Sequence, residues 1–350
     1  RLITLRSAVQ IRPPQPIMKQ KILIAGAGGF IGGHLVKYLR DKGKYDIVCA
    51  DIKPLEYWFQ LFDNNKNFSL DLKDYENCLK VSKDVDYIFN MACNMGGMGF
   101  IENNKAECMM SVLINANLLR ASIKNKVKKY LFSSSACVYN SQKQLKTFVP
   151  GLKETDAYPA DPEDGYGWEK LFSERMCRHF YEDFGLETRV IRYHNVYGPM
   201  GTFDGGREKA PAALCRKIIE AVNKDKKKID VWGDGKQTRS FLYIDDCIEG
   251  TLKVFNSKFS EVFNVGSEEQ VSINQMIEMI EEIANQKFEK NYQLDKPKGV
   301  RGRCSDNSLI RSKLGWDNKT TLKEGLQKTY KWIDEQIKSG SNIDKFTKSH

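Results

Sequence analysis

Continuous apolar runs alternate with amphipathic stretches over the first 195 residues of the chain. Six runs, at 21–27, 45–51, 68–71, 86–92, 129–135 and 188–195, have the apolar character of buried strands. Amphipathic stretches at 31–40, 74–82, 108–122 and 166–184 stand between them and predict helices. Strands that alternate with helices form a parallel sheet covered on both faces, so we expect a doubly wound α/β fold.

The first apolar run leads into a turn rich in glycine. Glycines recur at 26, 29 and 32, and the first predicted helix begins within this turn. A lone turn of this kind is common, but such glycines also let the backbone approach a pyrophosphate at the helix N-terminus. The second run ends in Asp51, about 20 residues further on, where a carboxylate accepts hydrogen bonds from a ribose and repels a 2′-phosphate. Together these features predict a Rossmann-type site that favours NAD over NADP.

Tyr166 and Lys170 are four residues apart, so on a helix they share one face. The lysine ammonium would favour the phenolate and lower the pKa of the phenol from about 10. Three serines, 133–135, close the fifth predicted strand about 30 residues earlier. An isolated pair of this spacing is usually helix surface, but these companions predict catalysis on a substrate hydroxyl. The predicted cofactor residues are Gly26, Gly28, Gly29, Phe30, Ile31, Gly32, Asp51, Asp71, Tyr166 and Lys170.

The remainder of the chain predicts a smaller α/β lobe over the carboxyl ends of the sheet. Polar loops are predicted at 203–209, 232–239 and 300–306, and helices at 272–286 and 322–337. We expect residues 18–195 and 240–266 to form the NAD-binding domain, and 196–239 and 267–337 to form the substrate-binding lobe. Residues 338–350 are expected to be a polar tail. Residues 1–17, with prolines at 13, 14 and 16, are expected to be a non-native or disordered leader.

Composition excludes several classes of protein. Hydrophobic residues make up 41% of the chain and charged residues 29%, as in soluble globular proteins, and no apolar run approaches the ~20 residues of a membrane span. Nine scattered cysteines and four histidines argue against a disulfide framework and a zinc site, and favour a reducing cytoplasm. The formal net charge of +10 suits an anionic small substrate, although solvated surface is the simpler interpretation of the basic runs.

These motifs resemble the extended short-chain dehydrogenase/reductase proteins, the NAD-dependent epimerase/dehydratase family, across residues 19–337. Five longer segments, at 95–100, 134–139, 205–213, 232–241 and 299–303, resemble more narrowly the GDP-mannose 3,5-epimerase branch of that family. The resemblance implies conversion of GDP-mannose to GDP-L-galactose and GDP-L-gulose, a step towards L-galactose and ascorbate, with tightly held NAD and a homodimer. Ala25, Asn140 and Trp168 stand where the family has Thr, Pro and Leu, and none of them removes a reacting group.

The chemistry that the resemblance implies is consistent with the residues present. A sugar C–H is too weak an acid for a protein base, but oxidation of the C4 hydroxyl to a ketone acidifies both C3 and C5. Tyr166 would take the hydroxyl proton, Lys170 would hold the nicotinamide ribose and Ser135 would orient the same hydroxyl. Cys137 is the candidate base on one face of the sugar and Lys209 the candidate acid on the other. The plainer interpretations are an inert buried thiol and a solvated lysine.

The substrate-binding residues that the resemblance implies come mostly from the loops of the smaller lobe. Arginine suits a diphosphate because its planar fork donates two hydrogen bonds to one phosphate, and Arg303 is favoured over Arg301 because Asp306 completes the family pattern. The full set is Gly96, Ser135, Ala136, Cys137, Asn195, Glu208, Lys209, Ala210, Lys217, Gln237, Thr238, Arg239 and Arg303. No metal is predicted.

Four other functions stay open at this point. A nucleotide-sugar 4-epimerase or a 4,6-dehydratase of the same family would share the fold and the Tyr–Lys pair, although a dehydratase typically carries an acid–base pair where this chain has Ala136 and Cys137. A regulator that binds NAD without catalysis is a third possibility, and such proteins tend to lose the Tyr or the Lys. Nucleic-acid binding is suggested by the positive net charge alone.

Overall fold

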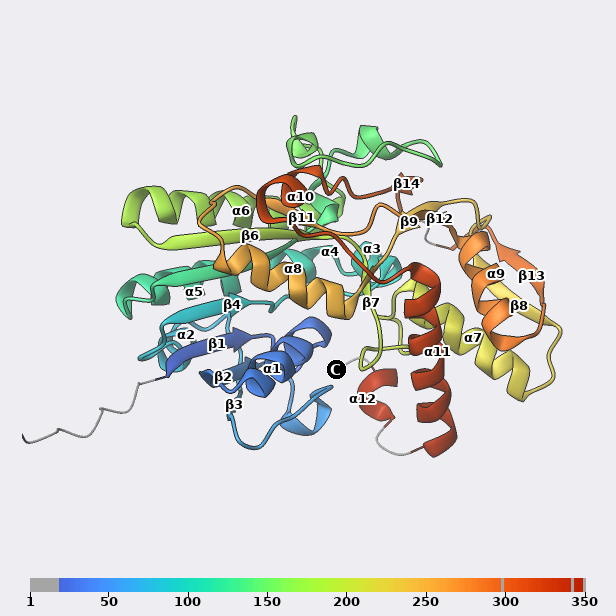
Figure 1. Cartoon of the computed structure of the whole chain (residues 1–350), viewed down its shortest axis with the longest axis horizontal. Coiled ribbons are helices and arrows are strands. Elements are labelled where there is room, and N and C mark those ends of the chain that lie inside the picture. Colours follow the sequence, from blue (N-terminus) through green and yellow to red (C-terminus); the bar gives the residue numbers. More distant parts are fainter. Residues whose placement is uncertain (1–18, 297–298, 341–342, 349–350) are drawn as a thin grey trace, which may run out of the picture.

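A seven-stranded parallel sheet forms the larger part of the molecule (Figure 1). The computed structural model describes residues 19–296, 299–340 and 343–348, so the predicted leader at 1–17 lies outside the described residues. The strand order is β11-β6-β5-β4-β1-β2-β3. The strands are β1 (Gln20–Ala25), β2 (Tyr45–Asp51), β3 (Lys66–Ser69), β4 (Tyr87–Asn90), β5 (Lys129–Ser135), β6 (Glu187–Tyr193) and β11 (Phe263–Val265). The predicted doubly wound fold is confirmed.

Alternate residues of each central strand are buried on opposite faces of this sheet. In β1, Ile22 and Ile24 pack in one apolar cluster, whereas Leu23 and Ala25 pack in another, and none is more than 1% exposed. Helices cover both faces of the sheet (Figure 1). They are α1 (Phe30–Lys42) and α8 (Ile244–Asn256) on the first, and α2 (Tyr75–Val81), α5 (Val112–Lys124) and α6 (Asp164–Phe184) on the second.

The segment after β4 is helical earlier than the sequence indicated. One helix was expected at 108–122 after a flexible glycine loop, but the chain forms α3 (Met98–Asn103), α4 (Lys105–Met109) and then α5. Gly97, in extended conformation, is the N-cap of α3, so the glycines at 96 and 97 stay outside the helix. The expectation that 95–99 is entirely loop is therefore wrong for its last two residues.

The smaller lobe packs against the carboxyl ends of the sheet, and both share one apolar core. Its helices are α7 (Ala210–Asn223), α9 (Ile273–Ala284) and α11 (Leu322–Ser339); α8 and β11 return to the large sheet between them. The remaining strands are β7 (Val196–Tyr197), β8 (Lys228–Trp232), β9 (Thr238–Ser240), β10 (Leu242–Tyr243), β12 (Gln270–Ser272), β13 (Glu289–Gln293) and β14 (Gly302–Arg303). Short helices η1 (Leu55–Tyr57), η2 (Ala136–Val138), η3 (Ser141–Gln144), η4 (Glu154–Ala157) and α10 (Ser308–Leu314) complete the fold.

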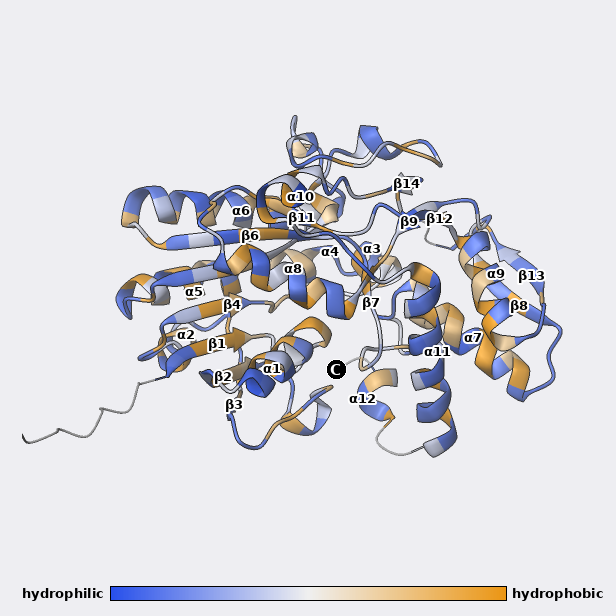
Figure 2. Cartoon of the chain, in the orientation of Figure 1, coloured by the Kyte–Doolittle hydropathy of each residue, from blue (hydrophilic) through white to orange (hydrophobic). Residues whose placement is uncertain are grey.

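Apolar residues follow the layers of this architecture (Figure 2). Strand β1, for example, is apolar along most of its length, whereas helices such as α9 have one apolar side and one polar side. None of the helices in the described part of the chain is both long and apolar enough to cross a membrane.

The C-terminal segment contributes to the core rather than extending from it. Residues 338–350 were expected to be a polar tail, but α12 (Asp344–Thr347) inserts Phe346 between the rings of Phe59, Phe203 and Trp332. Phe346 is only 2% exposed. One aromatic side chain thus fixes a segment that is otherwise polar, which a prediction from average polarity does not reveal.

Candidate active site

A cleft of about 810 Å³ lies at the carboxyl ends of the sheet strands, between the sheet and the smaller lobe. Its walls include the turns after β1, β2, β4 and β5 and the start of α7. The carboxyl ends of parallel strands are the usual ligand edge of such a sheet, because the connections there leave helix N-termini and loops facing the opening. The cleft brings together most of the site residues that the sequence indicated.

The glycine turn packs too closely for other residues. A Cβ on Gly32 would lie 2.1 Å from the Gly26 carbonyl oxygen, and Gly26 itself has a φ of 81°. Gly26, Gly29, Phe30, Ile31 and Gly32 line the cleft. This turn therefore leaves the N-terminus of α1 open to an anionic ligand.

Gly28 lies outside the cleft, contrary to its prediction as a cofactor residue. A Cβ there would lie 2.6 Å from the ring of Trp58, which packs behind the turn. The Gly28 amide donates to Asp51 Oδ2 at 3.0 Å, and the Lys53 amide donates to Asp51 Oδ1 at 3.0 Å. Burial raises the pKa of Asp51, although Lys53 and these amides oppose the effect. Asp51 thus stabilises the turn and also lines the cleft. Asp71 lines the cleft as well.

Helix α6 places Tyr166 in the wall of the cleft with Lys170 buried behind it. The Lys170 Nζ lies 4.7 Å from the ring centroid of Phe132, 5.6 Å from that of Tyr166 and 3.7 Å from Glu169 Oε2. The Lys170 side chain is 1% exposed, and its nitrogen has no hydrogen-bond partner among the described groups. Glu169 balances the charge but lies beyond hydrogen-bond distance, and a buried ammonium without a hydrogen-bond acceptor is costly, so this nitrogen is suited to a ligand hydroxyl or a phenolate.

The pKa of Tyr166 moves in the opposite direction from the prediction. Burial raises it well above its ordinary value, and the neighbouring sulfurs of Cys93 and Cys137 act in the same direction, opposed by the hydrogen bond with Ser135. The prediction that Lys170 brings this pKa down is therefore wrong in this structure. Burial also pulls the pKa of Lys170 down, but Cys93 and Glu169 outweigh it and the pKa is raised. Tyr166 accordingly stands as a protonated phenol beside a charged lysine.

Cys137 sits in η2, directly after the end of β5. The Ser135 hydroxyl accepts from the Cys137 amide at 3.2 Å, which fixes the turn, and the Arg303 Nη1 donates to the Cys137 Sγ at 3.5 Å. Burial raises the pKa of Cys137, while the Arg303 charge opposes the rise. A cation that can stabilise a thiolate therefore lies beside this sulfur.

Arg303 has protein partners where the sequence analysis expected a phosphate. Its Nε donates to Gln144 Oε1 at 2.6 Å and its Nη2 donates to Glu163 Oε2 at 2.6 Å, in addition to the bond to Cys137. The side chain of Arg303 is 4% exposed. Arg303 lines the cleft, but this geometry fits orientation of Cys137 better than a diphosphate clamp. Gln144 and Glu163 lie in segments without a sequence motif, so nothing in the sequence pointed to them.

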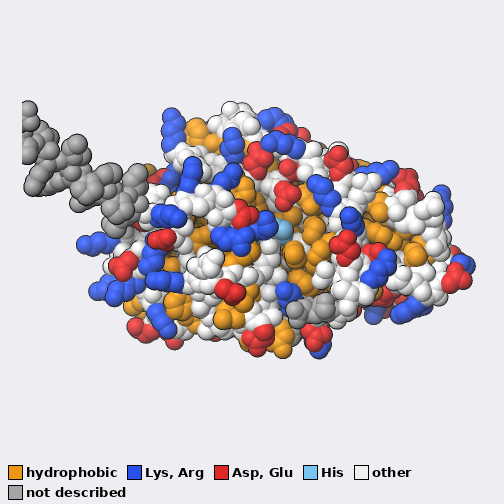
Figure 3. All heavy atoms as spheres, turned by 60° about the horizontal axis from the view of Figure 1, so that its bottom comes forward, with side chains coloured by type: hydrophobic (Ala, Val, Ile, Leu, Met, Phe, Trp, Pro, Cys, Tyr) orange, Lys and Arg blue, Asp and Glu red, His pale blue; other side chains and the backbone are white. Residues whose placement is uncertain are grey.

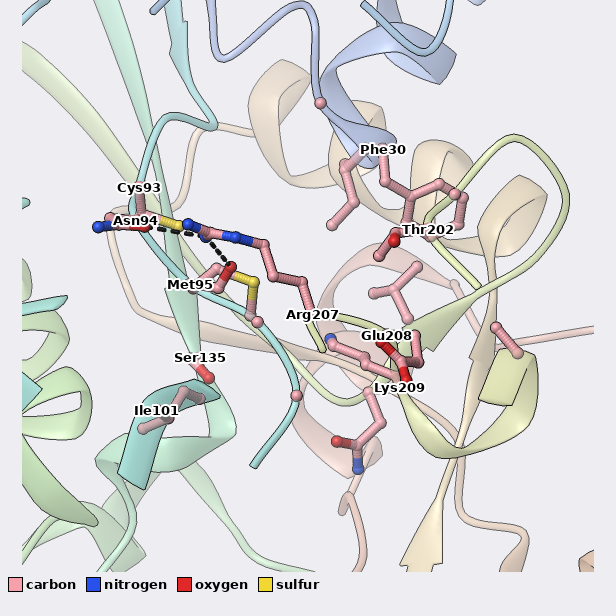
Figure 4. A pocket seen from close by; sticks show the side chains of 18 of the residues that line it. Phe30, Cys93, Asn94, Met95, Ile101, Ser135, Thr202, Arg207, Glu208 and Lys209 are labelled. Atoms are coloured by element: carbon pink, nitrogen blue, oxygen red, sulfur yellow. Dashed lines mark hydrogen bonds between the residues drawn. The ribbon is translucent and has the colours of Figure 1, made fainter. Parts of the chain in front are cut away.

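Lys209 is the N-cap residue of α7 and lines the same cleft as Cys137. In Figure 4 it extends from the side opposite Ser135, with its nitrogen directed into the space between. Burial lowers the pKa of Lys209, and Cys137 and Cys93 oppose the effect. None of the described carboxylates lies within ion-pair distance of Lys209, so its charge is available to a ligand.

The predicted substrate residues line the cleft with one exception. Thr238 is fully buried and donates to the Thr147 carbonyl oxygen, because side chains alternate along β9 and its neighbours Gln237 and Arg239 take the cleft side. The residues found in the cleft are Gly96, Ser135, Ala136, Cys137, Asn195, Glu208, Lys209, Ala210, Lys217, Gln237, Arg239 and Arg303.

Arg207 and Cys93 are among the cleft residues that the sequence analysis did not name as site residues. Arg207 donates from Nη1 to Asn94 Oδ1 at 2.9 Å and to the Met95 carbonyl at 3.0 Å (Figure 4), so it joins the loop before α3 to the loop before α7. Cys93 follows β4 and packs in the same small cluster as Cys137 and Tyr166. Its thiol was hidden among nine cysteines because only the fold brings it to Tyr166.

Comparisons with known proteins agree with this geometry. Residues 22–266 match the model of the NAD dependent epimerase/dehydratase family. The chain belongs to that family. It is similar to GDP-mannose 3,5-epimerase of Arabidopsis thaliana, with 45% identity over 95% of this chain and 88% of the relative. It is also 48% identical to GDP-mannose 3,5-epimerase 1 of Oryza sativa subsp. indica, over 92% of this chain and 84% of the relative.

Solved structures of other epimerases share the fold. UDP-glucose 4-epimerase of Thermotoga maritima, solved with UDP-glucose, is 27% identical, with a TM-score of 0.81 over 91% of this chain and all of that one. UDP-glucuronic acid 4-epimerase of Bacillus cereus, solved with UDP-glucuronic acid and NAD, is 27% identical with a TM-score of 0.76 over 90% and 99%. The resemblance drawn from the sequence motifs is confirmed.

The cofactor of this family is NAD, and the residues present fit it. The glycine turn can pack this closely against the start of α1 only without a Cβ at Gly32, which leaves the helix N-terminus open to a pyrophosphate, and the Lys170 nitrogen, which lacks a hydrogen-bond partner among the described groups, suits a ribose hydroxyl. The prediction of NAD is confirmed. Within the described residues, no group of three or more His, Cys, Asp or Glu side chains could hold a metal ion.

Proposed function

We propose that this protein is a GDP-mannose 3,5-epimerase, which inverts C3 and C5 of GDP-mannose to give GDP-L-galactose, and C5 alone to give GDP-L-gulose. The observation that carries the proposal is the presence of Cys137 and Lys209 in the cleft that also contains Tyr166. A 4-epimerase needs no proton transfer at carbon. Inversion beside a ketone needs both a base and an acid, and this cleft offers a thiol and an amine for the two tasks.

Tyr166, Ser135 and Lys170 are proposed to act on the C4 hydroxyl. When bound, NAD supplies a reversible acceptor for the hydride of C4. The buried ammonium of Lys170 stabilises Tyr166 as a phenolate, which takes the hydroxyl proton and becomes a phenol, and Ser135 orients the same hydroxyl. The raised pKa of Tyr166 makes this stabilisation necessary, because the phenol does not ionise unaided at neutral pH.

Cys137 and Lys209 are proposed to transfer protons at C3 and C5, the two carbons that a C4 ketone acidifies. Arg303, 3.5 Å from the Cys137 sulfur, stabilises the thiolate that acts as base. Burial lowers the pKa of Lys209, which brings this acid closer to neutral pH and makes it a better proton donor.

The diphosphate of the substrate is proposed to bind Arg239 and Lys217. Burial and the neighbouring Arg303 lower the pKa of Arg239 to about 10, so an anion beside it would be stabilised. Gln237 Oε1 is buried without a hydrogen-bond partner in the described structure and lines the same wall, which fits a donor on the guanine or its ribose. The remaining cleft residues, Gly96, Asn195, Glu208 and Ala210, are proposed to shape the sugar site.

Deuterium exchange tests the proposal. The protein is incubated with GDP-mannose in deuterated water, and the sugar is followed by NMR. Solvent deuterium at C3 and C5, together with GDP-L-galactose, is expected. Cys137→Ala should abolish the exchange, whereas Cys78→Ala, which removes a buried thiol of α2 that does not line the cleft, should retain it. GDP-mannose recovered without deuterium from the unaltered protein would reject the proposal.

A nucleotide-sugar 4-epimerase is the second candidate, because the similar structure from Thermotoga maritima is a UDP-glucose 4-epimerase. This activity would require Tyr166 and Lys170 but neither Cys137 nor Lys209. Inversion at C4 that survives in Cys137→Ala, with no solvent deuterium at carbon, would decide for it. A stable 4-keto-6-deoxy product would indicate a dehydratase instead.

A homodimer in the cytoplasm is part of the proposal. Large apolar side chains remain exposed on α4, α5 and α6, helices that contact one another, and on the turn after α4: Met109, Met110, Leu113, Trp168 and Phe172. Phe172, for example, is 59% exposed. The nine cysteines are unpaired, which fits a reducing compartment. Light scattering should give twice the chain mass, and Phe172→Glu should shift the protein towards monomer while Phe184→Glu, on the far end of α6, should not.

Basic and acidic side chains are interspersed on the face in Figure 3, so the net charge there is spread rather than gathered as a nucleic-acid surface would require. We also propose a division of the chain into an NAD-binding domain, 18–195 with 240–266, and a substrate lobe, 196–239 with 267–337. The packing of α8 and β11 with the large sheet supports the assignment of 240–266 to the first domain. Limited proteolysis with and without NAD would test this division.

A further inference from the structure

The C-terminal helix α12 joins two walls of the cleft that are far apart in the chain. On one side the ring of Phe346 packs 5.3 Å from that of Phe59, in the segment after β2. On the other side the Phe346 carbonyl accepts from the Phe203 amide at 3.0 Å and from the Thr202 hydroxyl at 2.8 Å. Figure 1 shows α12 between α11 and the segment that follows β2.

The loop that α12 holds reaches the N-terminus of α1. A Cβ on Gly201 would lie 3.0 Å from the ring of Phe30, the first residue of α1, and Figure 4 shows Thr202 beside Phe30. A Cβ on Gly205 would lie 2.4 Å from the Thr347 carbonyl oxygen. The loop at 201–205 is therefore fitted between α12 and the helix end where the glycine turn leaves room for a pyrophosphate.

Two lysines meet at Phe59 on the inner side of α12. The Lys345 Nζ donates to the Phe59 carbonyl at 3.2 Å, and the Lys53 Nζ lies 3.9 Å from the centroid of the Phe59 ring. Both line the cleft, and neither forms an ion pair with a carboxylate in the described part of the chain. Burial lowers the pKa of Lys53, Asp51 opposes the effect, and the charges of Arg207 and then Lys345 lower it further, so the two lysine charges repel each other. An anion bound between them would remove this repulsion.

We propose that α12 completes the dinucleotide site, and that Lys345, together with Lys53, binds a phosphate group of NAD. Lys53 follows two residues after Asp51, which lines the cleft at the end of β2, so the lysine pair lies at the adenosine side of the cofactor site rather than beside Tyr166. Phe346 supplies the attachment of the helix and Lys345 supplies the charge. The inference rests on NAD as the cofactor and not on GDP-mannose as the substrate.

Calorimetric titration of protein stripped of nucleotide tests the charge. Lys345→Ala should weaken the binding of NAD and of ADP-ribose about tenfold, as loss of one charge-assisted hydrogen bond does, and the loss should shrink at high salt. Lys345→Arg should retain most of the affinity. Lys331→Ala, which removes an exposed lysine of α11 away from the cleft, should leave it unchanged. GDP is titrated in parallel and should bind each variant equally.

Phe346→Ala tests the attachment. It should weaken NAD binding and also increase amide hydrogen exchange in the loop at 201–206, while Lys345→Ala should leave that exchange unchanged. Weaker NAD and ADP-ribose binding with unchanged GDP binding supports the proposal. NAD affinity within twofold of the unaltered protein in Lys345→Ala overturns it, and so does a loss confined to GDP or to NADP, or an equal loss in Lys331→Ala. No sugar is present, so the outcome is independent of the proposed epimerase activity.

Discussion

Glu163 and Arg303 exert opposite electrostatic effects on Cys137, which allows the proposed base to be tested by two substitutions with opposite signs. Arg303 lies 3.5 Å from the sulfur and lowers its pKa, whereas Glu163, bound to Arg303 at 2.6 Å, raises it. Removing the carboxylate charge by Glu163→Gln should therefore lower the pKa of Cys137. Arg303→Met should raise it further.

The size of the pKa change at Cys137 follows from the hydrogen bond that Arg303 donates to its sulfur. A hydrogen bond from a charged donor is worth about 1.5–3 kcal/mol, so loss of the Arg303 bond should raise the pKa of Cys137 by roughly one to two units, at about 1.36 kcal/mol per unit. Because burial already holds this pKa above its ordinary value, each unit reduces the thiolate fraction at neutral pH about tenfold. Deuterium incorporation by Arg303→Met should thus fall about 10- to 100-fold. Glu163→Gln should increase deuterium incorporation at low pH, by a smaller factor than the loss in Arg303→Met.

The pKa is measured directly as the pH dependence of alkylation of Cys137 by iodoacetamide, with Cys137→Ser as the blank for the other thiols. Arg303→Met also leaves Glu163 buried without its partner, so thermal unfolding must confirm that the variant is folded at the assay temperature. Movement of the alkylation pKa in the same direction by both substitutions, or by no more than a few tenths of a unit in either, would refute the proposed control of Cys137 by Arg303 and Glu163.

Three further predictions follow from other contacts. Lys170→Met should lower deuterium incorporation by at least 100-fold and weaken NAD binding measured by calorimetry, because a buried ammonium would be lost from beside Tyr166; equal NAD affinity would place Lys170 outside the cofactor site. Gly32→Ala should abolish NAD binding while the protein stays folded by circular dichroism, since the new Cβ would lie 2.1 Å from the Gly26 carbonyl, and normal binding would contradict the assigned turn. Burial lowers the pKa of His194 to about 3, so the unfolded state takes up a proton below about 6.5 that the folded state refuses; stability should be lost as the pH falls below 6.5, by ~2 kcal/mol at pH 5. Urea unfolding of His194→Gln should lack this part of the pH dependence, and an identical pH profile in both proteins would refute it.

Periodic apolar runs were enough to predict the fold class because each central strand is buried on both faces. The pattern of β1 and β2, together with the glycine turn, also located the N-terminus of α1. The boundaries were less predictable where short helices follow one another. Helices α3 and α4 are six and five residues long, too short for a period to be read from the sequence.

Some features of the candidate site could likewise be predicted from the sequence, and others could not. Tyr166 and Lys170 share one helix, so their proximity was contained in the sequence, and the start of α7 fixed Lys209. Thr238 was misplaced because a predicted turn proved to be a strand, in which alternate side chains leave the cleft. Arg303 was expected on a ligand because its partners Gln144 and Glu163 are more than 130 positions away in the chain and became visible only in the fold.

The sequence by itself determined which chemical groups this protein has and in what local geometry: glycines at a strand-to-helix turn, a phenol and an amine one helical turn apart, and a thiol after a strand. The tertiary structure alone decided the charge state of those groups and their neighbours. Burial depends on every segment that packs around a side chain, so the raised pKa values of Tyr166 and Cys137 could not be derived from local spacing. For the same reason only the fold could bring Lys345 from the last residues of the chain to Phe59 at the cleft.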